Sequence, residues 1–210
     1  MNQFLRLAVR IKHLCEALEL RVQREHAEVH ETAELLRGCH LENSRSRDQI
    51  QIGPETRVRS HLFVYGHGGR ISVGSECYLG HRTEIWSAAS VSIGNRVLIA
   101  HDVQIVDCTA HSQDPLERIH HYRRIIKSGH PRSAKELPGV FAAPITIEDD
   151  VWISFGCTIL KGVSIGARSI IAANSIVLRD VPPDTIYMNK VEPVMRRRNG
   201  TPTGDTDQTS

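Results

Sequence analysis

The chain of 210 residues carries 26 basic and 24 acidic side chains and a net charge of +2. A charge this small argues against a nucleic-acid-binding or membrane-surface protein, and the length allows one domain or one domain with an appendage. Aromatic residues make up only 5% of the chain, whereas Ile and Val together number 37. Because β-branched side chains favour strands, the composition predicts a core of β-structure.

The sequence predicts neither a membrane span nor a disulfide framework. No stretch reaches the roughly 18 apolar residues that a bilayer span needs, and the charged N-terminal segment lacks the apolar core of a signal peptide. The five cysteines are odd in number, widely spaced and contain no Cys-x-x-Cys motif. We therefore expect a cytoplasmic protein with reduced thiols, without disulfides or a zinc knuckle.

The N-terminal segment, residues 1–40, has the pattern of a helix. Between residue 3 and about residue 37 no Gly or Pro interrupts the chain, and apolar residues recur at helical spacing: Leu7, Ile11, Leu14, Leu18 and Val22. We expect an amphipathic helix that covers one end of the main domain, a partner-binding or membrane-surface helix being the alternative. The polar residues 41–49 are predicted to form a linker.

A repeat of six residues dominates the chain between residues 50 and 187. Six aliphatic side chains follow one another at this spacing without a slip: Ile147, Ile153, Ile159, Ile165, Ile171 and Val177. A helix cannot keep a period of six on one face, since successive positions would rotate by about 240°. Short strands that alternate with corners fit the period, and three units make one triangular coil. We predict a parallel β-helix, whose hand the period alone does not determine.

One interruption breaks the repeat at about residues 107–144. This insertion, predicted to be a long loop, is rich in basic residues and contains four histidines: His111, His120, His121 and His130. Long insertions at the corners of a solenoid commonly carry function. After the stop signal at residues 180–184, we expect a C-terminal segment, residues 188–210, with a flexible tail from Asn199.

Two blocks carry a family resemblance. The first is His-Ser-Gln-Asp-Pro-Leu-Glu-Arg from His111 to Arg118, and the second is Ile-Glu-Asp-Asp-Val-Trp-Ile-Ser from Ile147 to Ser154. With the hexapeptide repeat, they resemble the left-handed β-helix acyltransferases, in the branch of the galactoside, maltose, nodulation-factor and polysaccharide O-acetyltransferases. The resemblance covers residues 50 to 197. It implies an all-β, left-handed parallel β-helix that forms a homotrimer with active sites between subunits.

The resemblance also implies a reaction. An acetyl group would pass directly from acetyl-CoA to a hydroxyl of a sugar or surface-polysaccharide precursor, with His111 as the general base. A neutral imidazole can accept the hydroxyl proton in the transition state, which supports this role on physical grounds. Asp114 and Arg118 of the same block, and Trp152 beside the donor channel of a neighbouring subunit, would contact substrate.

The remaining site residues belong to the donor side. The family places an oxyanion-binding backbone N–H near Ser154 and Phe155, and a small residue at Ala173 where the pantetheine arm passes. Arg179 and Arg196 fall where basic residues meet the phosphates of coenzyme A.

The chain departs from the family in ways that concern the acceptor. The acidic residues that clamp simple sugars are missing from the coil before His111, and residues 188–192 replace the usual Ala-Gly-x-Pro-Ala. With the basic insertion, these differences favour a larger or anionic acceptor, such as a surface-polysaccharide or lipid-linked intermediate.

Two other functions are compatible with the sequence. A γ-type carbonic anhydrase shares this kind of fold and needs three zinc-binding histidines, two of them five residues apart. The candidates His81, His101 and His111 do not have that spacing, so we expect no metal. A non-catalytic β-helix scaffold is the second alternative.

Overall fold

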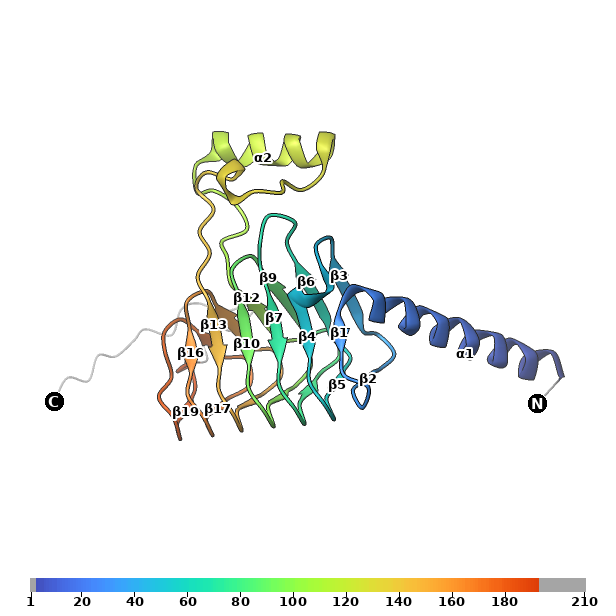
Figure 1. Ribbon diagram of the computed structural model, residues 1–210. Helices are drawn as coiled ribbons and strands as arrows, with labels where there is room; N and C mark the ends of the chain where they lie inside the picture. Colours follow the sequence, from blue (N-terminus) through green and yellow to red (C-terminus); the bar gives the residue numbers. More distant parts are fainter. Residues whose placement is uncertain (1–2, 193–210) are drawn as a thin grey trace, which may run out of the picture.

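Short parallel strands coil around one axis in the computed structural model, which describes residues 3–192 (Figure 1). The first sheet contains β1 (Glu28–Val29), β4 (Ile50–Ile52), β7 (Ile71–Val73), β10 (Val91–Ile93), β13 (Ile145–Ile147) and β16 (Ser164–Ile165). The second contains β2 (Glu34–Leu35), β5 (Arg57–Val58), β8 (Tyr78–Leu79), β11 (Leu98–Ile99), β14 (Trp152–Ile153), β17 (Ile170–Ile171) and β19 (Ile186–Tyr187). The third contains β3 (His40–Asn43), β6 (His61–Val64), β9 (Glu84–Ser87), β12 (Gln104–Val106), β15 (Thr158–Leu160) and β18 (Ile176–Val177).

The core is a set of aliphatic ladders inside this prism. Ile99, Ile153 and Ile171 occupy the same position in three successive strands of the second sheet, and each is fully buried. All six aliphatic residues of the uninterrupted repeat are buried in the same way. Each such side chain contributes about 1.5–3 kcal/mol by leaving water. The predicted parallel β-helix of hexapeptide repeats is confirmed.

Glycines at the corners allow the coils to stack closely. A Cβ built on Gly74 would lie 2.5 Å from the carbonyl oxygen of Gly94 in the next coil, so any larger residue would push the coils apart. Positive φ angles occur two residues after these glycines, at Glu76 and Arg96, with values of 57° and 55°. Gly74 and Gly94, each of which directly follows a buried aliphatic residue, are therefore needed for close approach rather than for a positive φ.

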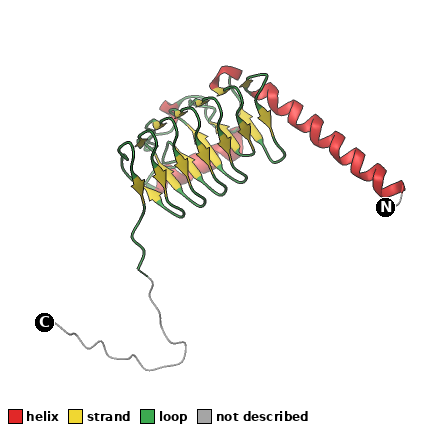
Figure 2. Cartoon of the chain, turned by 90° about the horizontal axis from the view of Figure 1, so that it is seen from below, coloured by secondary structure: helices red, strands yellow, loops and turns green. Residues whose placement is uncertain are grey.

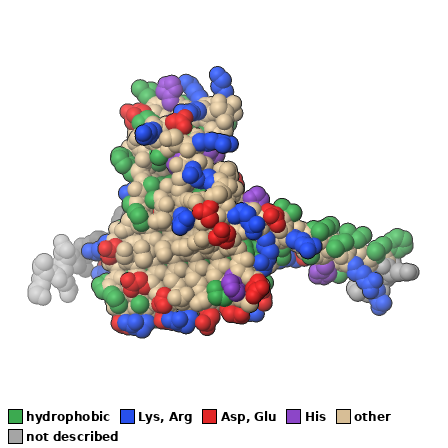
Figure 3. Space-filling model, viewed as in Figure 1, with side chains coloured by type: hydrophobic (Ala, Val, Ile, Leu, Met, Phe, Trp, Pro, Cys, Tyr) green, Lys and Arg blue, Asp and Glu red, His purple; other side chains and the backbone are tan. Residues whose placement is uncertain are grey.

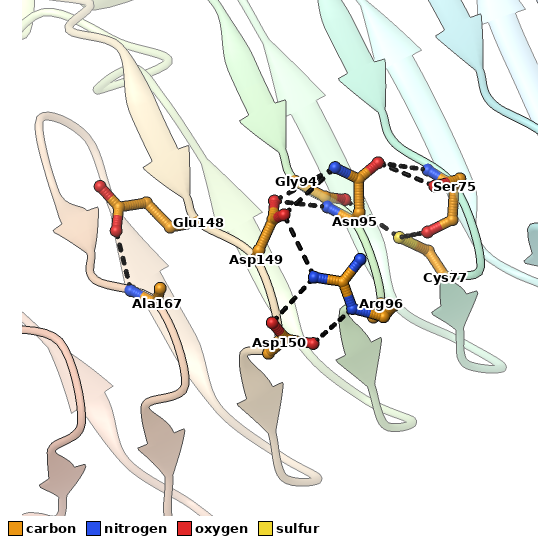
Figure 4. A network of polar contacts seen from close by, with 9 residues as sticks. All are labelled: Ser75, Cys77, Gly94, Asn95, Arg96, Glu148, Asp149, Asp150 and Ala167. Carbon is orange, nitrogen blue, oxygen red and sulfur yellow. Dashed lines mark hydrogen bonds and ion pairs between the residues drawn. The ribbon is translucent and has the colours of Figure 1, made fainter.

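Polar side chains tie these corners together (Figure 4). The Asn95 side-chain oxygen accepts hydrogen bonds from the N–H and the hydroxyl of Ser75, both at 2.9 Å, and the N–H of Asn95 donates to Asp149 at 2.9 Å. Arg96 binds the neighbouring Asp150 with an Nε–Oδ1 distance of 2.6 Å. The two aspartates of the second family block thus hold successive coils in register.

The N-terminal helix is shorter than predicted and does not cover the domain. Helix α1 (Gln3–Gln23) is followed by the short 3-10 helix η1 (Arg24–His26) and by β1, β2 and β3. The solenoid consequently begins before residue 30, where the sequence predicted helix and then a linker. The apolar stripe of α1 is solvent-exposed, from Leu7 at 56% to Val22 at 57%, and the helix projects from one end of the coil stack (Figure 2).

The insertion contains a helix instead of a continuous loop. Helix α2 (Pro115–Ser128) is capped by Asp114, starts with Pro115 and ends before Gly129, while η3 (Ala134–Glu136) follows it. A second 3-10 helix, η2 (Arg47–Gln49), occupies an earlier corner. In Figure 1, α2 lies above the corner loops that follow the third sheet.

Within residues 3–192, we find no helix that is both long and apolar enough to cross a bilayer. The predicted flexible tail from Asn199 lies outside the described residues.

Candidate functional site

A cavity of about 320 Å³ lies between the outer face of the third sheet and the insertion. The insertion forms a lobe above the body of the solenoid and carries several Lys and Arg side chains (Figure 3). Residues of three early coils and of the insertion line the cavity: Glu42, His61, Phe63, Tyr65, His67, Trp86, Ala110, His111, His121, Ile125, His130, Pro131 and Leu137.

The predicted base, His111, is one of these wall residues. It follows β12 at the point where the insertion leaves the solenoid, and Ala110 before it has a φ of 58°. The N–H of His111 donates to the carbonyl of Thr109 at 2.6 Å, which makes a tight turn. Below this turn, Thr109 and Phe141 pair through an N–H···O bond of 2.8 Å. The paired ends of the insertion, residues 107–109 and 141–143, form a stalk that carries His111 at the wall of the cavity.

Asp114 and Arg118 hold the backbone next to His111. The Asp114 carboxylate accepts hydrogen bonds from the N–H groups of Leu116 and Glu117, at 2.8 and 2.9 Å. Arg118 donates to the carbonyl of Ser112 at 3.0 Å. Neither residue lines the cavity. In this structure, both orient the segment that carries the histidine.

Asp107 anchors the foot of the stalk and was not singled out by the sequence. Its buried carboxylate accepts hydrogen bonds from the hydroxyl of Ser87 at 2.7 Å and from the N–H groups of Ala88 and Ala89 at 2.7 and 2.9 Å. Burial raises the pKa of Asp107, although these donors oppose the shift. Its carbonyl also accepts from Ala143, which closes the base of the insertion at 2.9 Å.

An aromatic cluster that the sequence did not reveal forms one wall. Phe63 lies edge-on to Tyr65 and to Trp86, with ring centroids 4.7 and 5.5 Å apart. The rings come from β6, the following corner and β9, so their proximity depends on coil stacking. Such a wall can pack against the C–H face of a sugar ring or another flat apolar group.

Five of the residues that line the cavity are histidines. His121 on α2 is only 5% exposed, and neither ring nitrogen has a hydrogen-bond partner among the described residues. Burial lowers the pKa of His67, and the neighbouring His130 acts in the same direction. A ligand with hydroxyl groups could satisfy these nitrogens.

Four of the residues predicted to lie near the donor are on a different edge of the prism from His111, whereas Arg179 follows the third sheet as His111 does. Trp152 is in the second sheet, while Ser154, Phe155 and Ala173 occupy the corner between the second and third sheets. The insertion with His111 leaves from the corner between the third and first sheets. One chain therefore does not bring the two groups together.

The local hydrogen bonds separate the two oxyanion candidates. The N–H of Ser154 donates to Ile171 at 3.0 Å and is occupied by the ladder. Within residues 3–192, the N–H of Phe155 has no acceptor, and its ring stacks on His101 with centroids 5.6 Å apart. Phe155 is therefore the better candidate for a backbone donor.

Comparisons with known proteins agree with the fold. A model described as bacterial transferase hexapeptide (six repeats) matches residues 144–179, and one described as hexapeptide repeat of succinyl-transferase matches residues 70–101. Galactoside O-acetyltransferase of Escherichia coli is 34% identical over 64% of this chain and 57% of its own length. The chain belongs to the hexapeptide-repeat acetyltransferase family.

Two solved structures are also similar to this chain. A hexapeptide-repeat acetyltransferase of Vibrio cholerae, solved with acetyl coenzyme A, is 30% identical, with 81% of this chain and 71% of that chain covered and a TM-score of 0.42. The N-acyltransferase AntD of Bacillus cereus shares the fold at 14% identity and a TM-score of 0.62, with 87% and 89% covered. The chain spans about 60% of the length of the curated relatives it matches.

Four further positions bear on the family site. Arg179 is exposed at the corner after β18, and Arg196 lies outside the described residues. His81 and His101, considered above as zinc ligands with His111, share the corner between the second and third sheets and so lie on another edge from His111.

Proposed function

We propose that this member of the hexapeptide-repeat acetyltransferase family transfers an acetyl group from acetyl-CoA to a hydroxyl of a sugar or surface-polysaccharide precursor. The observation that carries the proposal is the position of His111, on a hydrogen-bonded stalk at the wall of an aromatic-lined cavity. The galactoside O-acetyltransferase relative supports the reaction type.

His111 would act as a general base in a direct transfer. Its imidazole accepts the hydroxyl proton as the acceptor oxygen bonds to the carbonyl carbon of the thioester. A backbone N–H, that of Phe155 in this proposal, stabilises the oxyanion that forms. When the carbon–sulfur bond breaks, the thiolate of coenzyme A leaves and takes the proton from the imidazolium.

A second subunit would complete the site. His111 and Phe155 occupy different edges of one prism, so we propose a homotrimer. His111 of one subunit would face the donor corner of the next, which is the corner between the second and third sheets that carries Phe155 and Ala173. Trp152 and Ala173 would then border the path of the pantetheine arm, and Arg179 would meet the phosphates of coenzyme A.

The cavity and its surroundings suggest the acceptor class. The rings of Phe63 and Trp86 offer a stacking surface, and the histidines offer hydrogen bonds to hydroxyl groups. Exposed basic residues of α2, among them Arg123 and Lys127, would attract an anionic extension of the acceptor. An acidic oligosaccharide or a sugar carrying a phosphate fits this combination better than a neutral disaccharide.

The test follows thiol release from acetyl-CoA with neutral and anionic saccharide acceptors. His111→Ala should lower the acceptor-dependent rate by about 100-fold or more. The matched control is His120→Ala, an exposed histidine of α2 that does not line the cavity and should keep wild-type turnover. Undiminished turnover in His111→Ala would contradict the mechanism, and absence of acceptor-dependent release from the wild type would favour a scaffold.

A further inference from the structure

We propose that His40, Glu42 and His61 form a binding site for one divalent transition-metal ion, Zn²⁺ above others, at the edge of the cavity. Strands β3 and β6 pair in parallel with His40 directly beside His61. Because side chains alternate along a strand, Glu42 shares the outer face with both histidines. The three side chains can place one ligand atom each within 4.8 Å of one another.

The distances within this cluster fit an ion better than hydrogen bonds. A Glu42 carboxylate oxygen lies 3.8 Å from Nε2 of His40 and 3.6 Å from Nε2 of His61. Both separations exceed a hydrogen bond. Ligands held at 2.0–2.1 Å around a tetrahedral ion lie about 3.4 Å apart. A movement of a few tenths of an ångström would close the Glu42 contacts, and the exposed ring of His40 can move further.

His61 is already oriented as a metal ligand. Its Nδ1 lies 2.7 Å from a carboxylate oxygen of Glu84, and the indole N–H of Trp86 donates to that same oxygen at 2.9 Å. A carboxylate on Nδ1 keeps the proton there and leaves the lone pair of Nε2 available, which is the usual support of a metal-bound histidine. The Nε2 atom of His61 is buried and has no hydrogen-bond partner in the described part of the chain.

The donor set indicates the kind of ion. Two imidazole nitrogens and one carboxylate oxygen suit Zn²⁺ and neighbouring transition metals rather than Mg²⁺ or Ca²⁺, which prefer oxygen ligands. Three protein ligands leave a coordination position open. Because Glu42 and His61 both line the cavity that contains His111, that position would take water or an oxygen atom of a molecule bound in the cavity.

The test measures metal binding by the full chain, without turnover. After dialysis against a chelator, titration calorimetry with Zn²⁺ should give one site per chain, and Co²⁺ should produce the visible absorption of a low-symmetry nitrogen and oxygen site. His61→Ala should abolish the site, and Glu84→Gln should weaken it by about 10- to 100-fold. The matched control, His13→Ala, removes an exposed histidine that also lies near a glutamate, Glu16, and should bind as the wild type does.

A second measurement guards against misfolding of the His61 variant. Zn²⁺ should raise the melting temperature of the wild type but not that of Glu42→Gln, whose substituted side chain is exposed. If the wild type binds no Zn²⁺, or if His61→Ala and Glu42→Gln bind it equally well, the proposal is wrong and the cluster only supports the aromatic wall.

Discussion

The carboxylate of Asp114 accepts a hydrogen bond of 2.8 Å from the N–H of Leu116 and so caps helix α2 beside the catalytic candidate His111. Asn is as good a helix cap as Asp, whereas Ala provides none. Asp114→Ala should therefore cost about 1 kcal/mol of stability and lower turnover by roughly tenfold through misplacement of His111. Asp114→Asn should preserve both quantities. Equal loss of turnover in Asp114→Asn would instead indicate that the negative charge itself contacts substrate, which unfolding curves and steady-state rates together would distinguish.

If His111 and the donor corner of one site come from different subunits, two inactive variants should complement each other. His111→Ala removes the base, and Ala173→Trp fills the proposed path of the pantetheine arm. In a cyclic trimer reassembled from equal amounts of both, about a quarter of the sites between subunits would combine an intact base with an intact donor corner. Acetyl-CoA turnover of the mixture should rise to about that fraction of the wild-type rate. Two variants that remain inactive after co-refolding would contradict a shared site.

Two aspartates should affect stability with opposite dependence on pH. Burial raises the pKa of Asp107 above the usual 3.8, whereas the hydrogen bond from Arg82 lowers the pKa of Asp102 below it. The stabilisation linked to protonation of Asp107 is present below pH 3.8 and is lost as the pH rises through its raised pKa. The stabilisation from Asp102 is present above pH 3.8 and is lost as the pH falls through its lowered pKa.

Denaturant unfolding at a series of pH values measures this contrast. Relative to Asp107→Asn, the wild type should lose free energy of unfolding as the pH rises above 3.8. Relative to Asp102→Asn, it should lose free energy of unfolding as the pH falls below 3.8. Each variant serves as the control for the other. If the free energy of unfolding changed with pH in the same direction in both comparisons, the local environments of Asp107 and Asp102 would not determine their titration.

Helix α1 should contribute to stability through its last residue and not through its apolar stripe. The side-chain oxygen of Gln23 accepts a hydrogen bond of 2.6 Å from the buried N–H of Leu41. Gln23→Ala leaves that donor unpaired and should cost about 1–3 kcal/mol. The double variant Leu7→Ser and Ile11→Ser alters exposed positions and should change the free energy of unfolding by about 0.5 kcal/mol or less. A large loss that depends on protein concentration would instead reveal a second copy packed on the helix.

The sequence predicts the later coils well because their signal is local. Uninterrupted spacing from Ile147 to Val177 reports directly on buried positions, and every one of them is in the core. The first coil carries the same signal at Val29, Leu35 and Leu41, which are six residues apart and form part of β1, β2 and β3. This repeat is hard to recognise in the sequence because the residues between its members are mostly polar. In addition, no Gly or Pro marks the end of the preceding helix. Helix α2 also had a signal, since Asp114 and Pro115 are a cap and a first-turn proline, and Gly129 ends the segment.

The cavity is different, because it depends on register between coils. His40 and His61 are neighbours only because β3 pairs with β6, and Trp86 joins them through β9. The lengths of the corners determine which residues of neighbouring strands lie side by side, and no local pattern in the sequence reveals that register. His111 is therefore predictable from its motif, whereas the aromatic wall and the cluster around His61 are not. Spacing along the chain reveals metal-binding histidines only where they are close in sequence, and His40 and His61 are 21 residues apart.

The stalk at the base of the insertion separates the insertion from the pairing of the solenoid. Asp107 pairs with Ala143, Cys108 with Ala142 and Thr109 with Phe141, so the two ends of the insertion meet before the chain reaches α2. The entropic cost of closing a loop grows only slowly with its length, by about 0.6 kcal/mol for each doubling, so a longer insertion would add little to that cost. Strands β12 and β13 pair with neighbouring coils independently of what lies between them. We therefore expect the insertion to tolerate replacement by a segment of another length or sequence while the pairing of the solenoid strands is preserved.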